Sequence, residues 1–87
     1  MGSLSTALAT GQTGFVPDGS GLVKEEIVVT GSSAVAGDTG TYTSIMKQPQ
    51  RVEGGPLSYS ISGQTVTLMD EAGLGNAKTG ASIYGYP

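Results

Sequence analysis

The sequence predicts an all-β protein: a small antiparallel β-sandwich or barrel-like domain with an extended N-terminal arm. Glycine, serine and threonine make up 35 of the 87 residues, a composition that suits short strands and tight turns better than helices. Apolar and polar side chains alternate in several short segments, and glycine- or proline-containing turns separate these segments. We therefore expect two regions, an extended N-terminal arm over residues 1–21 and a β domain over residues 22–87.

The first region is polar, rich in glycine and without a regular apolar period. It ends in the turn-forming run from Pro17 to Gly21. Its substantial apolar side chains are Leu4, Leu8, Phe15 and Val16. Two interpretations remain open. The region is either a flexible terminus or an arm that becomes ordered against a neighbouring subunit through Leu4, Leu8 and Phe15. Leu4 and Leu8 are four residues apart and could share one side of a short helical turn.

The first strand of the domain is expected over residues 22–30, where β-branched residues lie between two glycines. Ile27, Val28 and Val29 follow one another, so their side chains point to both faces of the strand and both faces require cover. A sandwich or a subunit interface provides that cover. A second strand is expected over residues 41–46, after a loop of small residues with a turn at Gly37 and Asp38.

Later segments predict further strands. Pro49 cannot donate a ladder hydrogen bond, so residues 47–53 should form an edge strand or a crossing between sheets. The final segment, residues 81–86, reads ASIYGY and should place Ile83 and Gly85 on one face, with both tyrosines on the other. In total we expect five to seven short strands.

The clearest strand pair lies between Leu57 and Leu68. A two-residue turn at Ser62 and Gly63 would pair Tyr59 with Val66 and the two terminal leucines with each other. One face of this hairpin would then be apolar and the other covered by serine and threonine. We expect the hairpin to nucleate the core through Leu57, Tyr59, Ile61, Val66 and Leu68.

The composition argues against enzymatic activity, and we expect no catalytic residue and no cofactor. Histidine and cysteine are absent, which removes the usual general base and the imidazole and thiolate ligands of metals. The loop over residues 73–79 fails as a phosphate-binding loop, because Ala72 and Ala77 stand where that motif needs glycine. We expect Asp38 and Asp70 to close turns by bonding the backbone, with calcium binding as the alternative.

The charge and length of the chain limit which partners it can bind. Four basic residues are dispersed among seven acidic ones, for a net charge of −3, so the chain has no basic patch for nucleic acid. Its first residues resemble neither a signal peptide nor a membrane span, and we expect a soluble protein made in a cytoplasm without a membrane partner. A chain this short buries only roughly 60–65% of its unfolded surface. Because disulfides are excluded as well, we expect stabilisation by association, as a homo-oligomer.

Six residues are our interface candidates. Tyr84 and Tyr86 share one face of the last strand, and a tyrosine can pack its ring while its hydroxyl reaches water or a partner. The apolar side chains of the first region complete the set. The candidates are Leu4, Leu8, Phe15, Val16, Tyr84 and Tyr86.

Three segments, in order, resemble small β-rich bacteriophage virion proteins of the capsid decoration or head-associated type. They are GDTGTYT at residues 37–43, RVEGGPLSYSISGQTVTL at 51–68 and ASIYGY at 81–86. The resemblance implies a non-enzymatic virion protein, assembled in the host cytoplasm, that binds the major capsid protein or another virion protein and stabilises the capsid. The alternative is a small carbohydrate-binding or adhesive β-module on a virion or cell surface, with Tyr84, Tyr86 or Tyr42 stacking on a sugar.

Overall fold

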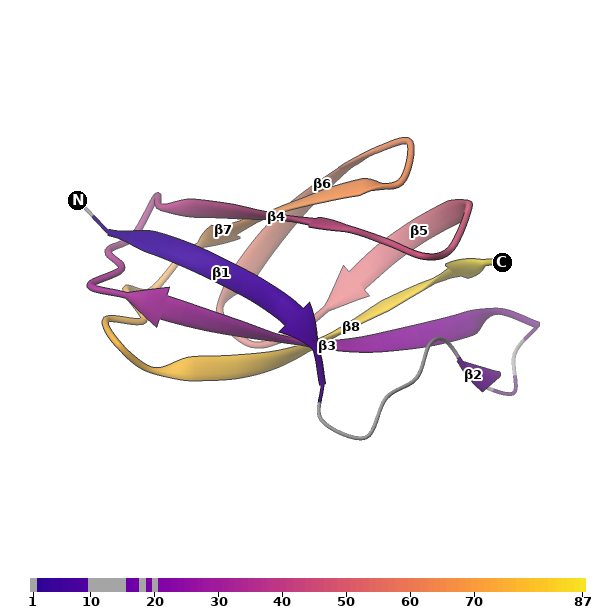
Figure 1. Ribbon diagram of the computed structural model, residues 1–87, viewed down its shortest axis with the longest axis horizontal. Helices are drawn as coiled ribbons and strands as arrows, with labels where there is room; N and C mark the ends of the chain where they lie inside the picture. Colours follow the sequence, from indigo (N-terminus) through magenta and orange to yellow (C-terminus); the bar gives the residue numbers. More distant parts are fainter. Residues whose placement is uncertain (1, 10–15, 18, 20) are drawn as a thin grey trace.

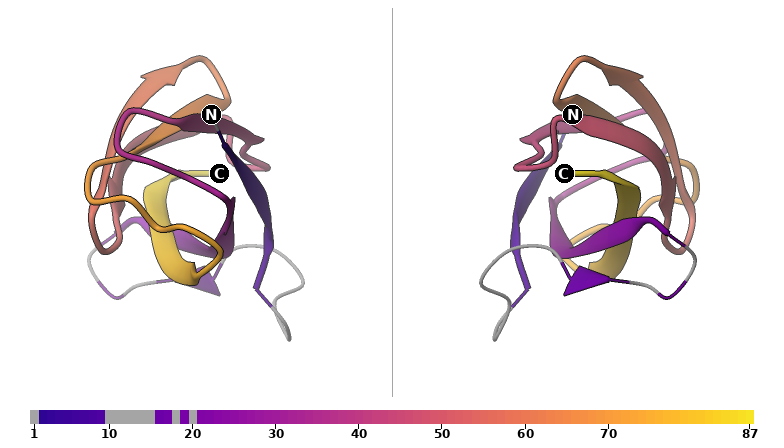
Figure 2. Two further views of the ribbon diagram at one scale, coloured as in Figure 1. Left: turned by 90° about the vertical axis from the view of Figure 1, so that its left-hand side faces the viewer. Right: turned by 90° about the vertical axis from the view of Figure 1, so that its right-hand side faces the viewer.

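The structure, a computed structural model, describes residues 2–9, 16–17, 19 and 21–87. All the regular secondary structure within these residues is β-strand. Two antiparallel sheets pack together as a small sandwich, which confirms the predicted fold class (Figures 1 and 2). The five-stranded sheet contains β1 (Ser3–Leu8), β2 (Val16–Pro17), β3 (Val23–Ser32), β8 (Lys78–Tyr86) and β5 (Gln48–Glu53). The three-stranded sheet contains β4 (Thr39–Thr43), β7 (Thr65–Asp70) and β6 (Leu57–Ser62).

Alternating side chains of the inner strands fill the space between the sheets. Ile27 and Val29 of β3 face Val66 and Leu68 of β7 across this core, and all four are at most 1% exposed. The other members of the core cluster are Leu4, Ala34, Met46, Val52, Ala81 and Ile83. Val28 points to the outer side of β3 and is only partly covered. Of the three consecutive apolar residues, Ile27 and Val29 therefore lie on the buried face of β3, and Val28 lies on the half-buried outer face.

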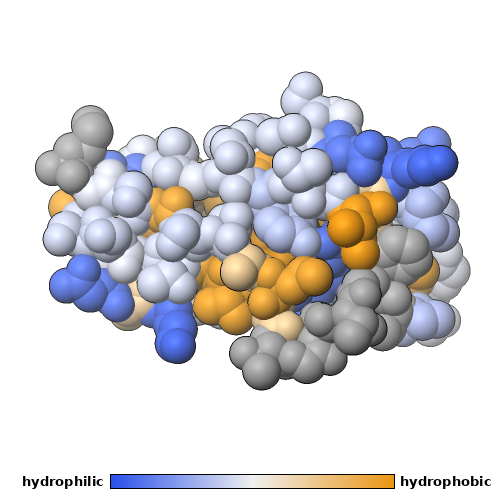
Figure 3. All heavy atoms as spheres, in the orientation of Figure 1, coloured by the Kyte–Doolittle hydropathy of each residue, from blue (hydrophilic) through white to orange (hydrophobic). Residues whose placement is uncertain are grey.

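The start of the chain belongs to the sheet of this same subunit. β1 pairs with β3 from Ser3 opposite Ser32 to Leu8 opposite Ile27, and Leu4 is 7% exposed in the core. The expectation of a separate arm is therefore wrong for residues 3–8. The spacing of Leu4 and Leu8 fits one side of a helical turn, but it equally fits one face of a strand. In Figure 3, apolar residues gather near the place where the end of β1 crosses β3.

One side of the sandwich is closed by the approach of β1 to β4. The Thr6 hydroxyl donates a hydrogen bond of 2.7 Å to the Thr41 carbonyl. A Cβ atom on Gly40 would lie 2.7 Å from the Leu4 carbonyl oxygen, so only glycine allows the two backbones to come this close.

The β6–β7 hairpin forms as expected, but in a different register. Its turn residues are Gly63 and Gln64, so Tyr59 pairs with Leu68 and Ile61 with Val66. Gly63 has a φ of +62°, as the first central residue of a type II′ turn requires. The pairing moves by two residues from the expected register, and a shift of two leaves each side chain on the same face.

The expectation for the edge strand β5 is confirmed, whereas the expectation for Tyr59 on the edge strand β6 is wrong. β5 is an edge strand with a register shift between Pro49 and Arg51, as its proline predicted. Tyr59 was expected in the core, but it is 43% exposed, because β6 is an edge strand with a neighbouring strand on one side only. The described residues form eight strands, one more than the upper end of the expected range, and both β1 and the two-residue β2 lie where no strand was expected.

Candidate functional site

A buried glutamate joins the two sheets. Glu25 lies on the inner face of β3 and has no exposed surface. Its carboxylate accepts hydrogen bonds from the Tyr42 hydroxyl of β4 and from the Ser44 hydroxyl, the latter at 2.7 Å. The Ile45 amide donates to it from 3.5 Å. Burial raises the pKa of Tyr42, and the hydrogen bond and negative charge of Glu25 raise it further, so the phenol keeps its proton and remains a donor.

Glu25 and Ser44 are both buried, and each carboxylate oxygen of Glu25 has a hydrogen-bond donor, so the arrangement suits a structural link rather than a reaction centre. Glu25 was not among the residues singled out from the sequence. The sequence contains the signal that reveals it. Alternate residues of a strand point to the same face, so Glu25 shares its face with Ile27 and Val29, two core residues of the same strand.

Asp70 and Asp38 close turns, as predicted. Asp70 has no exposed surface, and its carboxylate accepts hydrogen bonds from the amides of Ala72, Gly73 and Leu74 at 3.0, 2.8 and 2.6 Å. The Leu74 amide contributes most to lowering the pKa of Asp70, burial opposes it, and the other two amides add to the lowering.

Asp38 holds two segments together. Its Oδ2 atom accepts hydrogen bonds from the amides of Gly2 at 3.1 Å and Val35 at 2.9 Å. Both aspartates thus have backbone donors as their partners. Within the described residues, no three potential metal-ligating side chains come together.

The outer face of the five-stranded sheet carries charges around Tyr84. This residue pairs with Lys24 on one side and Arg51 on the other. The Arg51 guanidinium lies 4.3 Å from the centroid of the Tyr84 ring, a cation–π contact that covers part of the ring. Each cation also contacts an acid on its own strand, Lys24 with Glu26 at 3.5 Å and Arg51 with Glu53 at 3.2 Å.

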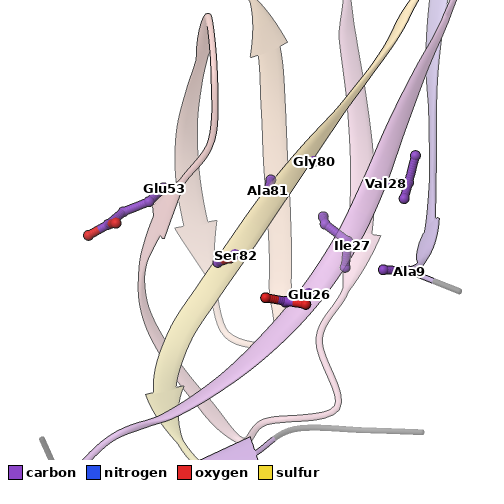
Figure 4. A pocket seen from close by; sticks show the side chains of 8 residues that line it. All are labelled: Ala9, Glu26, Ile27, Val28, Glu53, Gly80, Ala81 and Ser82. Atoms are coloured by element: carbon purple, nitrogen blue, oxygen red, sulfur yellow. The ribbon is translucent and has the colours of Figure 1, made fainter. Parts of the chain in front are cut away.

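A shallow hollow of about 270 Å³ lies beside this charged area (Figure 4). Glycine at position 80 leaves space between Val28 and the backbone of β8. Glu26 and Glu53 both line the hollow, but Figure 4 shows Glu53 directed away from the other side chains. Because each acid also contacts a cation of its own strand, the hollow does not present the converging carboxylates that acid–base chemistry needs.

The outer face of the three-stranded sheet has a different character. Three rows of side chains run across its strands in register, and we call them the hydroxyl face. The rows are Thr43–Thr65–Ser62, Thr41–Thr67–Ser60 and Thr39–Met69–Ser58. Eight of these nine residues carry a hydroxyl group and none is charged. Glu71 reaches one corner, where it accepts a hydrogen bond of 2.7 Å from the Ser58 hydroxyl.

The sequence revealed only part of this face. The serines of β6 and the threonines of β7 were expected on the wet or partner-facing side of the hairpin, and they lie there. The threonines of β4 join them only because β4 pairs with β7, a contact between segments more than 20 residues apart. A second hollow, of about 210 Å³, lies on this face near Met69.

Leu4, Leu8, Tyr84 and Tyr86, the interface candidates whose side chains the structure describes, do not form one surface. Leu4 is used inside the core, so its assignment to an interface is wrong. Leu8, at the end of β1, is 38% exposed. Tyr84 and Tyr86 share the outer face of β8, as expected, and Tyr86 is 47% exposed. Val16 pairs with Lys24 through its backbone, and Phe15 lies outside the described residues.

Comparison with known proteins adds no relative, because no protein-family model, curated protein or solved structure matches this chain. In the part of the chain that the structure describes, no helix is long and apolar enough to cross a membrane.

Proposed function

We propose that this protein is a non-enzymatic structural protein of a virion, which binds a viral capsid through subunit contacts and stabilises it in the manner of a decoration protein. The observation that carries the proposal is the hydroxyl face. Eight of its nine residues carry a hydroxyl group, and none is charged. The buried centre of protein interfaces is depleted of charge and enriched in methionine, which fits the uncharged face and Met69, whereas serine is not enriched there.

The chemistry of the face also suits contact with another protein. A hydroxyl group both donates and accepts hydrogen bonds, so it can pair with backbone or side-chain groups of a partner. Serine and threonine are short side chains on a paired backbone, so ordering them on binding costs less entropy than ordering long charged side chains. The partner we propose is the major capsid protein or another protein of the virion, and the resemblance of the sequence to head-associated proteins supports this choice.

Co-sedimentation with purified capsid shells of the virus that carries the protein tests the proposal. Thr67 lies at the centre of the hydroxyl face, and Thr67→Lys should abolish binding to the shells, because a lysine there leaves a charge buried in the contact. Ser82→Lys is the matched control, since Ser82 is equally half-buried on the central part of the other sheet. Binding that survives Thr67→Lys, or no binding by the wild type, would refute the proposal.

A carbohydrate-binding module is our second proposal, and one observation favours it. Tyr86 is 47% exposed on the outer face of β8 and can offer its ring to a sugar. The hydroxyl of Tyr42 is bonded to Glu25, and Arg51 covers part of the ring of Tyr84, so Tyr86 is the better platform. A glycan array tests this proposal, with sugar binding by the wild type and its loss in Tyr86→Ala as the expected result. An array without a bound glycan would refute it.

A further inference from the structure

β6 presents an open strand edge. It is the last strand of the three-stranded sheet and pairs with β7 alone, over all six residues and without a register shift. β6 lies near the preceding strand β5, but among the described residues no backbone hydrogen bond joins the other side of Leu57–Ser62 to β5 or to a further strand. Half of the amide and carbonyl groups of such an edge point away from the sheet and are ready to pair with another strand.

The other sheet edges carry features that block such pairing. β5 contains Pro49, a register shift and the charged pair of Arg51 and Glu53. β1 and β4 lie against each other, held by the hydrogen bond from Thr6 to the Thr41 carbonyl. β6 has no proline, no bulge and no charged residue in its sequence LSYSIS. By the criteria that distinguish protected edges from open ones, β6 is open.

We propose that β6 pairs antiparallel with β6 of a second copy of this chain, so that a two-fold axis joins the two three-stranded sheets into one continuous sheet. A two-fold contact brings a strand against its own reversed sequence. Because serine occupies every even position from Ser58 to Ser62, a register centred on Ser60 or on Tyr59 places serine opposite serine and apolar residues opposite apolar residues. The strand itself contains no charged residue.

The contact also explains the exposure of Tyr59. This ring is 43% exposed on the inner side of an edge strand, next to Leu57 and Ile61, which pack against the core. In the register centred on Ser60, Tyr59 lies opposite Ile61 of the second copy, and each covers the other. The hydroxyl faces of both copies then form one surface across six strands. The proposal goes beyond the proposed function and does not depend on it, because the dimer forms without a capsid.

Sedimentation velocity of the purified protein over a wide concentration range tests the dimer. We expect a monomer–dimer equilibrium, because a single strand pair is a small contact. Ser60→Lys should raise the dimer dissociation constant at least several-fold, since like charges face each other across the two-fold axis. Thr41→Lys is the control, because Thr41 lies in the same row at the opposite edge of the sheet, and it should dimerise like the wild type.

A charge-reversal experiment makes the test specific to the edge. An equimolar mixture of S60K and S60E should associate more tightly than either variant alone, because opposite charges then meet at the axis. Circular dichroism confirms that each variant is folded. A wild type that stays monomeric at every concentration, a dimer that S60K leaves unchanged, or a mixture that associates no better than its components would each overturn the proposal. None of these measurements involves capsid shells, so their failure is separate from failure of the proposed function.

Discussion

The Tyr42 hydroxyl on β4 donates a hydrogen bond to the Glu25 carboxylate on β3, so a polar contact connects the two sheets through the core. The aliphatic side chains around it are attracted to one another without preferred direction. A hydrogen bond between fixed groups has a direction, so this contact selects one way of stacking the sheets. The Ser44 hydroxyl adds a second bond to the same carboxylate and strengthens this selection.

Tyr42→Phe should therefore destabilise the protein. The ring remains, but the Glu25 oxygen that accepts from the Tyr42 hydroxyl then keeps only the long 3.5 Å hydrogen bond from the Ile45 amide, and a poorly satisfied buried acceptor costs about 1–3 kcal/mol. The measurement is urea unfolding of the variant and the wild type. Tyr86→Phe is the control and should change the free energy of unfolding little, because Tyr86 is exposed. Equal effects of the two substitutions would contradict the role of the Glu25 contact.

Asp70 should make the protein sensitive to acid. Its folded-state pKa lies below the unfolded value, so its contribution to stability is present above the unfolded pKa of about 3.9 and is lost as the pH falls through the folded pKa. Asp70→Asn should lower stability at neutral pH and flatten its decline in acid. Urea midpoints from pH 7 to pH 2 give both quantities. An unchanged slope in the variant would show that Asp70 does not control this range.

Gly40→Ala should loosen the side of the sandwich where β1 meets β4. The new methyl group would lie 2.7 Å from the Leu4 carbonyl oxygen, so one of the two backbones must move. We expect a loss of about 1–3 kcal/mol, typical of overpacked sites, and faster amide exchange in β1. Gly80→Ala is the matched control in a strand, because the nearest atom to its Cβ is 4.0 Å away. Slower or unchanged exchange in β1 of Gly40→Ala would contradict the close approach.

Gly63→Ala should destabilise the β6–β7 hairpin for a different reason. Space is available, since no atom lies within 4 Å of the added Cβ, but the φ of +62° is unfavourable for an L-residue. The expected cost is about 1–2 kcal/mol. Thermal unfolding compares this variant with Ser62→Ala, which changes the neighbouring residue of the strand. If the Gly63→Ala variant is as stable as the wild type, the turn does not have the conformation described.

The features that local pattern determines were predictable from the sequence. Alternation fixed the faces of the hairpin, Pro49 identified an edge strand, and the aspartates at positions 38 and 70 were expected at turns. The hairpin register differed because Gly63 occupies the first turn position rather than the second, a choice that a serine–glycine pair leaves open.

Features that depend on distant pairing were not predictable. β1 becomes a strand only through its contact with β3, and its two leucines fit a helical turn equally well. The hydroxyl face needs β4 beside β7, which no local signal indicates. Alternation along β3 places Glu25 on the face of Ile27 and Val29, but its hydrogen-bond donors, Tyr42 on β4 and Ser44 directly after β4, come from distant parts of the chain and could not be located from the sequence.

The two outer faces differ so strongly in charge that they should respond differently to ionic strength. Salt weakens contacts between exposed charges, and the Debye length falls from about 10 Å at 0.1 M to about 3 Å at 1 M. Lys24, Glu26, Arg51 and Glu53 place such charges on the five-stranded sheet, whereas the nine residues of the hydroxyl face carry none and Glu71 reaches one corner of it. The salt dependence of a binding reaction therefore reports which side of the sandwich a partner occupies, even before any residue of the contact has been mapped.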